Sequence, residues 1–138
     1  MNDVLHRLYI DLEDDNISYC LLRRYNDRDG DVDLMFFERD IIKIESLLIH
    51  KYNGVKVCSK LYYPHIQYHL PFFKEDKLQY LIIDCVFDFI FGKNMKKINF
   101  SLKKSDFFNS LKKYDGKYLS PSKEYLTVFL AIHIFLEN

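Results

Sequence analysis

The sequence predicts an α+β fold in which a mixed β-sheet carries helices packed mainly on one face. Two periodicities support this prediction. Apolar residues recur at helical spacing in some segments, and they form short continuous or alternating runs in others. These segments follow the order helix, strand, strand, helix, several strands and then helices, which is typical of a mixed sheet. The 138 residues suit a single domain spanning residues 1–138, because no internal repeat or linker divides them.

The first part of the chain is predicted to form two helices that enclose two strands. Each helix has its apolar residues on one face and stops at a polar or turn-forming run. The first strand is almost continuously apolar, as in a strand buried on both faces. The predicted elements are a helix at 3–13, strands at 17–22 and 31–37, and a helix at 38–51 that ends before Asn53-Gly54.

The second part is predicted to be strand-rich and then helical. Its strands are separated by a proline and by a polar turn, and its helices begin at capping residues. The predicted elements are strands at 55–62, 66–70 and 78–87, a turn at 71–77, a helix at 105–114 and a last helix from Ser120-Pro121 to residue 136.

The last predicted helix is apolar nearly all round between Tyr125 and Leu136. Such a helix is too short to span a bilayer and has to be covered. We therefore expect residues 105–138 to form a helical extension that packs on the sheet or on a partner. The candidate partners for residues 121–137 are a second copy of the chain, another helical protein or further sequence.

The candidate site begins with Asp31 and Asp33 at the start of the second strand. Alternate residues of a strand point to the same face, so these two carboxylates share one face, with their backbone positions about 7 Å apart. Paired carboxylates beside a loop can bind a hard divalent cation through oxygen. The alternative is a solvated strand end with ordinary surface acids.

A calcium loop is a second interpretation of the same acids, because Asp27, Asp29, Asp31 and Asp33 alternate and Glu38 is twelfth from Asp27. That loop requires glycine at its sixth position and a helix on each side. Val32 occupies the sixth position, and the flanking segments are predicted strands. The pattern therefore argues against a calcium loop.

The third candidate acid is Asp84, which lies inside the longest apolar run with strand character. A carboxylate in such a run costs several kcal/mol unless it is paired or binds a metal. Asp84 is therefore expected either to complete the site or to meet a basic side chain at the sheet edge. Asp88 is the alternative if the register differs by a few residues.

Composition narrows the class of protein. Basic and acidic residues both number 20, and this balance argues against a nonspecific nucleic-acid binder.

The three cysteines show no zinc spacing and lie in hydrophobic runs, so we expect buried, reduced thiols in a cytoplasmic protein. No window is long and apolar enough for a membrane span, and the first 15 residues do not resemble a signal peptide.

The ordered set of acids resembles the nucleotidyltransferase fold of the DNA polymerase β-like superfamily. In that family a strand leads to a Gly-Ser turn, an Asp-x-Asp strand, a helix and a later strand with a third acid. The sequence is most similar to a bacterial subgroup associated with polysaccharide and capsule biosynthesis. The similarity extends over about residues 3–137. The first motif is residues 17–23 followed by 31–34, and the second is residues 119–124 followed by an apolar helix.

The resemblance implies a Mg²⁺-dependent transfer of a nucleoside monophosphate from ATP or another nucleoside triphosphate to a hydroxyl of a small molecule, sugar or protein. Asp31, Asp33 and Asp84 would be the catalytic and metal-binding residues, with Mn²⁺ as a substitute metal. Two metal ions about 3.5–4 Å apart would stabilise the attacking and leaving oxygens.

One departure from the family concerns the turn before the Asp-x-Asp strand, where Arg23-Arg24-Tyr25 replaces Gly-Ser. Arg23, Arg24 and Arg28 can bind phosphate by charge, or they can block the pocket. The first case favours an active nucleotidyltransferase. The second favours a catalytically degenerate module that binds a nucleotide or a protein partner. A metal-dependent nuclease is disfavoured, because no Glu-x-Lys follows an acid near Asp84.

Overall fold

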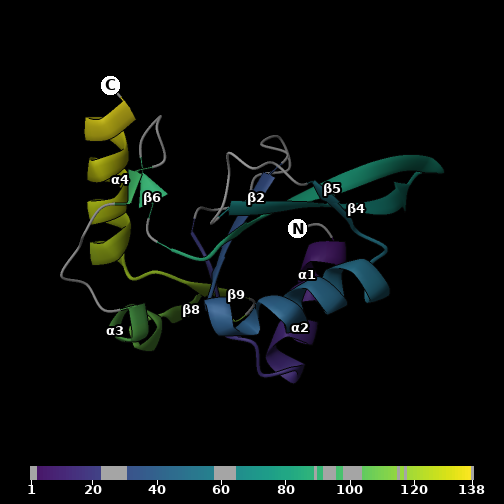
Figure 1. Ribbon diagram of the computed structural model, residues 1–138, viewed down its shortest axis with the longest axis horizontal. Coiled ribbons are helices and arrows are strands. Elements are labelled where there is room, and N and C mark those ends of the chain that lie inside the picture. The colour runs from purple at the N-terminus through teal and green to yellow at the C-terminus, as the bar shows by residue number, and fades with distance from the viewer. Residues whose placement is uncertain are drawn as a thin grey trace.

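The computed structural model describes residues 3–22, 31–57, 65–88, 90–91, 96–97, 104–114, 116 and 118–137. Helices and strands follow one another in a mixed order (Figure 1). The elements are α1 (Asp3–Asp14), β1 (Tyr19–Leu21), β2 (Asp31–Phe36), η1 (Glu38–Asp40), α2 (Ile41–Ser46), η2 (Leu47–Lys51), β3 (Val55–Val57), β4 (His65–Lys74), β5 (Lys77–Val86), β6 (Ile90–Phe91), β7 (Lys96–Lys97), α3 (Lys104–Asn109), β8 (Lys112–Tyr114), β9 (Tyr118–Ser120) and α4 (Lys123–Glu137).

The main sheet has five strands in the order β1-β2-β5-β4-β3. The central pair, β2 and β5, is parallel, and the other three pairs are antiparallel. The chain between β2 and β5 passes through α2, β3 and β4. The two parallel strands are therefore joined by a long crossover connection, as parallel strands require. This arrangement confirms the predicted α+β class with a mixed sheet.

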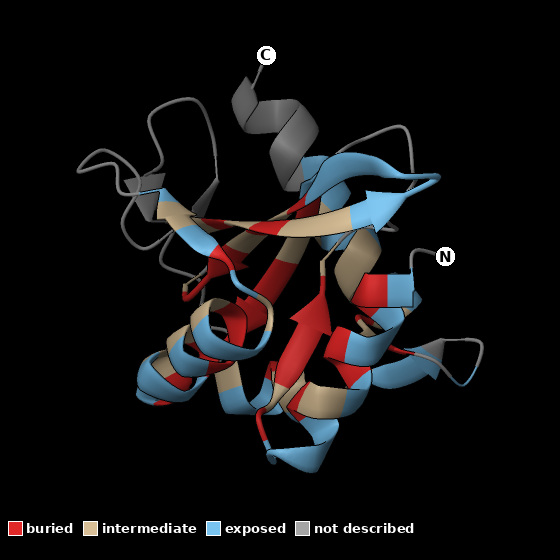
Figure 2. Cartoon of the chain, turned by 90° about the vertical axis from the view of Figure 1, so that its right-hand side faces the viewer, coloured by how far each residue is buried: buried red, intermediate tan, exposed pale blue. Residues whose placement is uncertain are grey.

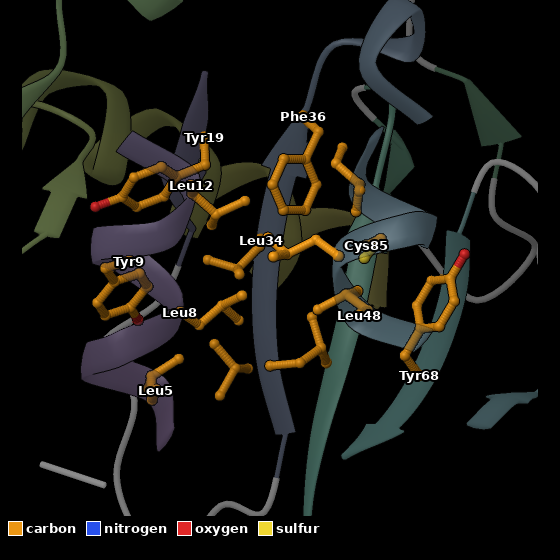
Figure 3. Packing of buried hydrophobic residues seen from close by; sticks show 14 of the residues in the cluster. Leu5, Leu8, Tyr9, Leu12, Tyr19, Leu34, Phe36, Leu48, Tyr68 and Cys85 are labelled. Atoms are coloured by element: carbon orange, nitrogen blue, oxygen red, sulfur yellow. The ribbon is translucent and has the colours of Figure 1, made fainter. Parts of the chain in front are cut away.

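One face of the sheet is covered by α1 and α2 (Figures 1 and 3). Apolar side chains of α1, such as Leu8 and Leu12, pack against alternate residues of β2, such as Leu34 and Phe36. All four are 1% exposed or less, as expected for the inward-facing positions of a strand and the apolar stripe of a helix. Leu48, on η2, closes the other side of this core.

The ends of these two helices are defined by residues in the left-handed conformation. At the end of α1, Asn16 has φ 54°, and the Ile17 amide donates a 2.8 Å hydrogen bond to the Leu12 carbonyl. At the end of η2, Asn53 has φ 55°, and the Gly54 amide donates to the Leu48 carbonyl at 2.8 Å. Asparagine tolerates this conformation, so both predicted helix stops are confirmed.

The β4–β5 hairpin differs from the prediction of a turn over residues 71–77. Strand β4 continues through Pro71 to Lys74, and only Glu75 and Asp76 form the loop. Their φ values of 51° and 61° are those of a two-residue hairpin turn whose twist matches the strands. Strand β3 pairs only as far as His69, so Pro71 lies where β4 has one neighbour and a missing amide donor is tolerated.

Helices also contact the opposite face of the sheet, so the prediction of helices mainly on one face is wrong. On that face Met35 and Val86 pack with Phe107 of α3, and Tyr125 and Phe129 of α4 pack against this cluster. The sequence alternation explains the result, because β2 is apolar on both faces toward its end. A second apolar surface therefore needs its own cover.

The prediction of a helix over residues 105–114 is only partly right. Helix α3 ends at Asn109, and residues 112–114 form β8, which pairs with β9. This hairpin docks beside β1, where the Leu119 amide donates to the Tyr19 hydroxyl and Lys113 pairs with Glu13 at 3.2 Å. Long-range contacts therefore override the local helical pattern.

The last helix, α4, begins at Lys123, close to the predicted Ser120-Pro121 start. Its Tyr125 and Phe129 are partly buried, whereas Val128 and Leu130 are 48% and 59% exposed. Among the helices that the structure describes, none is both long enough and apolar enough to cross a membrane.

Candidate functional site

The candidate site is built on the parallel pair at the centre of the sheet. Asp33 of β2 and Asp84 of β5 are Cα partners in this pair, so their side chains lie on the same face. Neighbouring strands are about 4.8 Å apart, which places the two carboxylates side by side. Both residues are partly buried. The structure therefore brings together two acids that are far apart in the sequence.

Asp31 lies on the same face as Asp33 at the start of β2, and its Cα partner is Ile82. Asp31 is exposed. Within the described ranges, no group of three or more His, Cys, Asp or Glu side chains is arranged to hold a metal ion. Mg²⁺ usually takes one or two carboxylates and completes its shell with phosphate oxygens and water. The Asp33–Asp84 pair fits that chemistry.

Strand β4 adds two polar side chains to the acid-bearing face. Gln67 is the Cα partner of Asp84, and its amide Nε2 donates a 2.8 Å hydrogen bond to Asp84 Oδ1. The amide Oε1 of Gln67 lies 2.9 Å from His69 Nε2. A hydrogen-bonded row therefore runs from Asp84 through Gln67 to His69. Neither Gln67 nor His69 is predicted from the sequence as a site residue.

A signal for these two residues is present in the sequence. From His65 to Leu70, polar and apolar residues alternate strictly, which predicts a strand with one polar face. Tyr68 and Leu70, on the apolar side, are fully buried. The alternation could have placed Gln67 and His69 on one face. It could not have shown that this face also carries Asp33 and Asp84.

The acid-bearing face is open beyond the site. Val57 is the Cα partner of Gln67, and Val55 is the partner of His69. These valines are 41% and 59% exposed, and Tyr80, whose ring contacts His69, is 53% exposed. Exposed residues continue toward the end of the β4–β5 hairpin (Figure 2). A ligand bound at Asp33 and Asp84 would therefore have accessible surface on this side.

The predicted phosphate-binding residues Arg23, Arg24 and Arg28 lie outside the described residues. The residues that flank this segment are described. The Leu22 amide donates a 3.0 Å hydrogen bond to the Asp33 carbonyl, and β2 begins at Asp31. The described residues on either side of this segment, Leu22 and Asp31, therefore lie beside Asp33.

The described cysteines, Cys20 and Cys85, are free and buried, which confirms the prediction of buried thiols for these two residues. Burial raises the pKa of both thiols, and for Cys85 the nearby charges of Asp84 and Glu45 raise the pKa further. A thiol with a raised pKa is a poor nucleophile. Cysteine chemistry at this site is therefore disfavoured, and Cys58 lies outside the described residues.

No protein-family model, curated protein or solved structure matches this chain.

Proposed function

We propose that this chain is a nucleotidyltransferase-like protein that binds a Mg²⁺–nucleoside triphosphate on the acid-bearing face of its sheet. The observation that carries the proposal is the register of Asp33 and Asp84 on neighbouring parallel strands. Like charges at adjacent positions on one face repel each other. A bound divalent cation offers a reason for this pairing, because it converts the repulsion into shared coordination.

The order of elements supports the same proposal. Strand β1 leads to β2 with Asp31 and Asp33, helix α2 follows, and β5 brings Asp84 beside β2. This is the order expected from the resemblance to the DNA polymerase β-like superfamily. The bacterial subgroup associated with polysaccharide and capsule biosynthesis remains the proposed relative.

In the proposed reaction the three acids have two tasks, cation binding and acceptance of a proton. Asp33 and Asp84 would hold the cation, Mg²⁺ or Mn²⁺, and Asp31 would contribute from the exposed end of β2. Asp84 would also accept the proton of the acceptor hydroxyl as that oxygen attacks the α-phosphorus and pyrophosphate leaves. The bound cation would neutralise phosphate charge, and Arg23, Arg24 and Arg28 would add positive charge from the adjoining segment.

A second candidate is a catalytically degenerate module that binds nucleotide or a protein partner without transfer. Two observations favour it. Arg23-Arg24-Tyr25 replaces the family's Gly-Ser turn, and within the described parts of the chain the three acids do not form a three-ligand metal group. The two candidates share the fold and differ in chemistry.

The test separates binding from transfer. Calorimetry with Mg²⁺ and each of the four nucleoside triphosphates measures binding, and pyrophosphate release or self-labelling measures transfer. The proposed enzyme binds at least one triphosphate only when metal is present, and it releases pyrophosphate. Binding without release identifies the degenerate module. If no triphosphate binds with Mg²⁺ or Mn²⁺, the nucleotide proposal is wrong.

A further inference from the structure

We infer that Gln67 is a positioning residue that orients the Asp84 carboxylate, and that His69 holds the Gln67 amide in the required direction. The inference rests on the proposed function for its role in cation binding. The hydrogen bonds themselves do not depend on that function. They connect three side chains of two neighbouring strands on the face that carries the acids.

The direction of the Gln67 amide follows from what its neighbours can donate and accept. An ionised carboxylate only accepts hydrogen bonds, so the 2.8 Å contact with Asp84 Oδ1 requires the amide nitrogen. The amide oxygen is then the atom 2.9 Å from His69 Nε2. Because an amide oxygen only accepts, His69 has to carry a hydrogen on Nε2. The two contacts thus define one consistent hydrogen-bond direction.

This direction gives Asp84 a fixed orientation. A strand side chain with one carbon before its carboxylate rotates about few torsions, and a bond to one oxygen restricts the last of them. The donor is on β4, whereas the neighbouring acid, Asp33, is on β2 on the other side of β5. Gln67 therefore supplies an attractive contact on one side of Asp84, opposite the repulsive neighbour.

Hydrogen-bond partners of metal-binding carboxylates affect cation affinity without contacting the cation. Loss of such a partner typically weakens metal binding by about 10- to 100-fold. A neutral amide suits this role, since it donates to the carboxylate and adds no negative charge. Gln67 and Asp84 are also Cα partners within the β4–β5 ladder, so the strands hold both residues in place.

The first experiment measures Mn²⁺ affinity by calorimetry in the intact chain. Gln67→Met keeps a side chain of similar length and removes the amide, and we expect it to weaken Mn²⁺ binding about tenfold. Gln79→Met is the matched control, because Gln79 is exposed on β5 and lies on the other face. Gln67→Asn tests rescue, because its shorter amide is expected to restore binding only partly.

The outcomes distinguish the inference from the proposed function. If wild type binds Mn²⁺ and Gln67→Met binds it equally well, the positioning role is wrong and the proposed function stands. If wild type binds neither Mn²⁺ alone nor a triphosphate in the presence of Mg²⁺, the proposed function and this role for Gln67 are both wrong. Circular dichroism of each variant shows whether a loss of binding reflects loss of fold.

A second readout needs no activity. The chain has two glutamines, Gln67 and Gln79, so their side-chain amide signals can be assigned in a nitrogen-15 spectrum. We expect Asp84→Ala, and separately Mg²⁺ in wild type, to shift the Gln67 amide signal and leave that of Gln79 in place. A Gln67 signal that is insensitive to Asp84→Ala would overturn the inference.

Discussion

Asp33 and Asp84 are Cα partners on the two parallel strands at the centre of the sheet, with both side chains on the same face. Carboxylates at adjacent positions on one face repel each other unless other groups offset their charge. The remaining acid of the predicted site, Asp31, is two residues before Asp33 on that face and is exposed. The proposed function therefore depends most directly on the Asp33–Asp84 pair.

The first prediction concerns metal-dependent binding of triphosphate. We expect Asp33→Asn to abolish measurable affinity for a Mg²⁺–triphosphate complex, because an amide cannot supply the negative charge that the cation needs. Asp31→Asn is expected to have the same effect if all three acids act together. Asp76→Asn is the control, since Asp76 is exposed in the hairpin turn, where asparagine tolerates the positive φ. Calorimetry that finds wild-type affinity in Asp33→Asn would remove Asp33 from the site.

The second prediction concerns stability at low pH and the carboxylate of Asp11. Burial acts to raise the Asp11 pKa, but hydrogen bonds from Lys51 and Tyr52 and the charges of Lys51 and Arg7 outweigh it. The Lys51 contact is 2.6 Å long. The net result is a pKa below the ordinary value of 3.8. These interactions join α1 to the end of η2.

A carboxylate whose pKa is lower in the folded state stabilises the fold at pH values where it is ionised in both the folded and the unfolded state. This contribution is fully present above pH 3.8 and is lost as the pH falls through the lower, folded pKa. We therefore expect Asp11→Asn to lower the free energy of unfolding at pH 7 and to have a smaller effect near pH 2. Urea unfolding at both pH values measures this difference. Asp15→Asn, at an exposed acid just beyond the same helix, is the control for the loss of one negative charge.

The third prediction concerns the close packing at Gly54. A Cβ atom at this position would lie 2.6 Å from the Leu48 carbonyl oxygen and 2.6 Å from Leu70 Cδ2. We expect Gly54→Ala to destabilise the protein by about 1–3 kcal/mol, because backbone and core side chain both have to move. Gly116→Ala is a useful comparison: it has φ 65° but nothing within 4 Å, so only conformational strain is added. Equal unfolding midpoints for wild type and Gly54→Ala would contradict the steric argument.

The fourth prediction concerns the attachment of the β8–β9 hairpin. The Tyr19 hydroxyl accepts a 3.3 Å hydrogen bond from the Leu119 amide and donates a 3.4 Å bond to Glu13. Tyr19→Phe keeps the ring and removes both bonds, so we expect a loss of about 1–2 kcal/mol in the free energy of unfolding. Tyr80→Phe, at an exposed tyrosine, should change stability by less than about 0.5 kcal/mol. A similar change in both variants would argue against a specific role for the Tyr19 hydroxyl.

Much of the first half of the fold could be predicted from local pattern. The helix predicted at 3–13 is observed as α1, and the strand predicted at 31–37 as β2. The predicted helix at 38–51 is observed as the continuous run of η1, α2 and η2. These segments have a clear apolar period and clear stop signals, so the residues that decide them are close in sequence.

The errors occurred where local signals were weak or conflicted with long-range contacts. Pro71 suggested a break, but β4 continues through it because β3 has already ended and no donor is needed there. Glu75-Asp76 forms a two-residue hairpin turn without the usual glycine. Residues 112–114 form a strand rather than a helix because they pair with β9.

The sequence by itself determined that Asp31 and Asp33 share a face, since the two-residue period of a strand is a local property of the backbone. Only the tertiary structure decided that Asp84 lies beside Asp33 and that Gln67 and His69 complete the row. Strand order and register depend on contacts between distant segments and on which faces are buried. A one-residue change in register would have moved Asp84 to the other face without altering any local pattern.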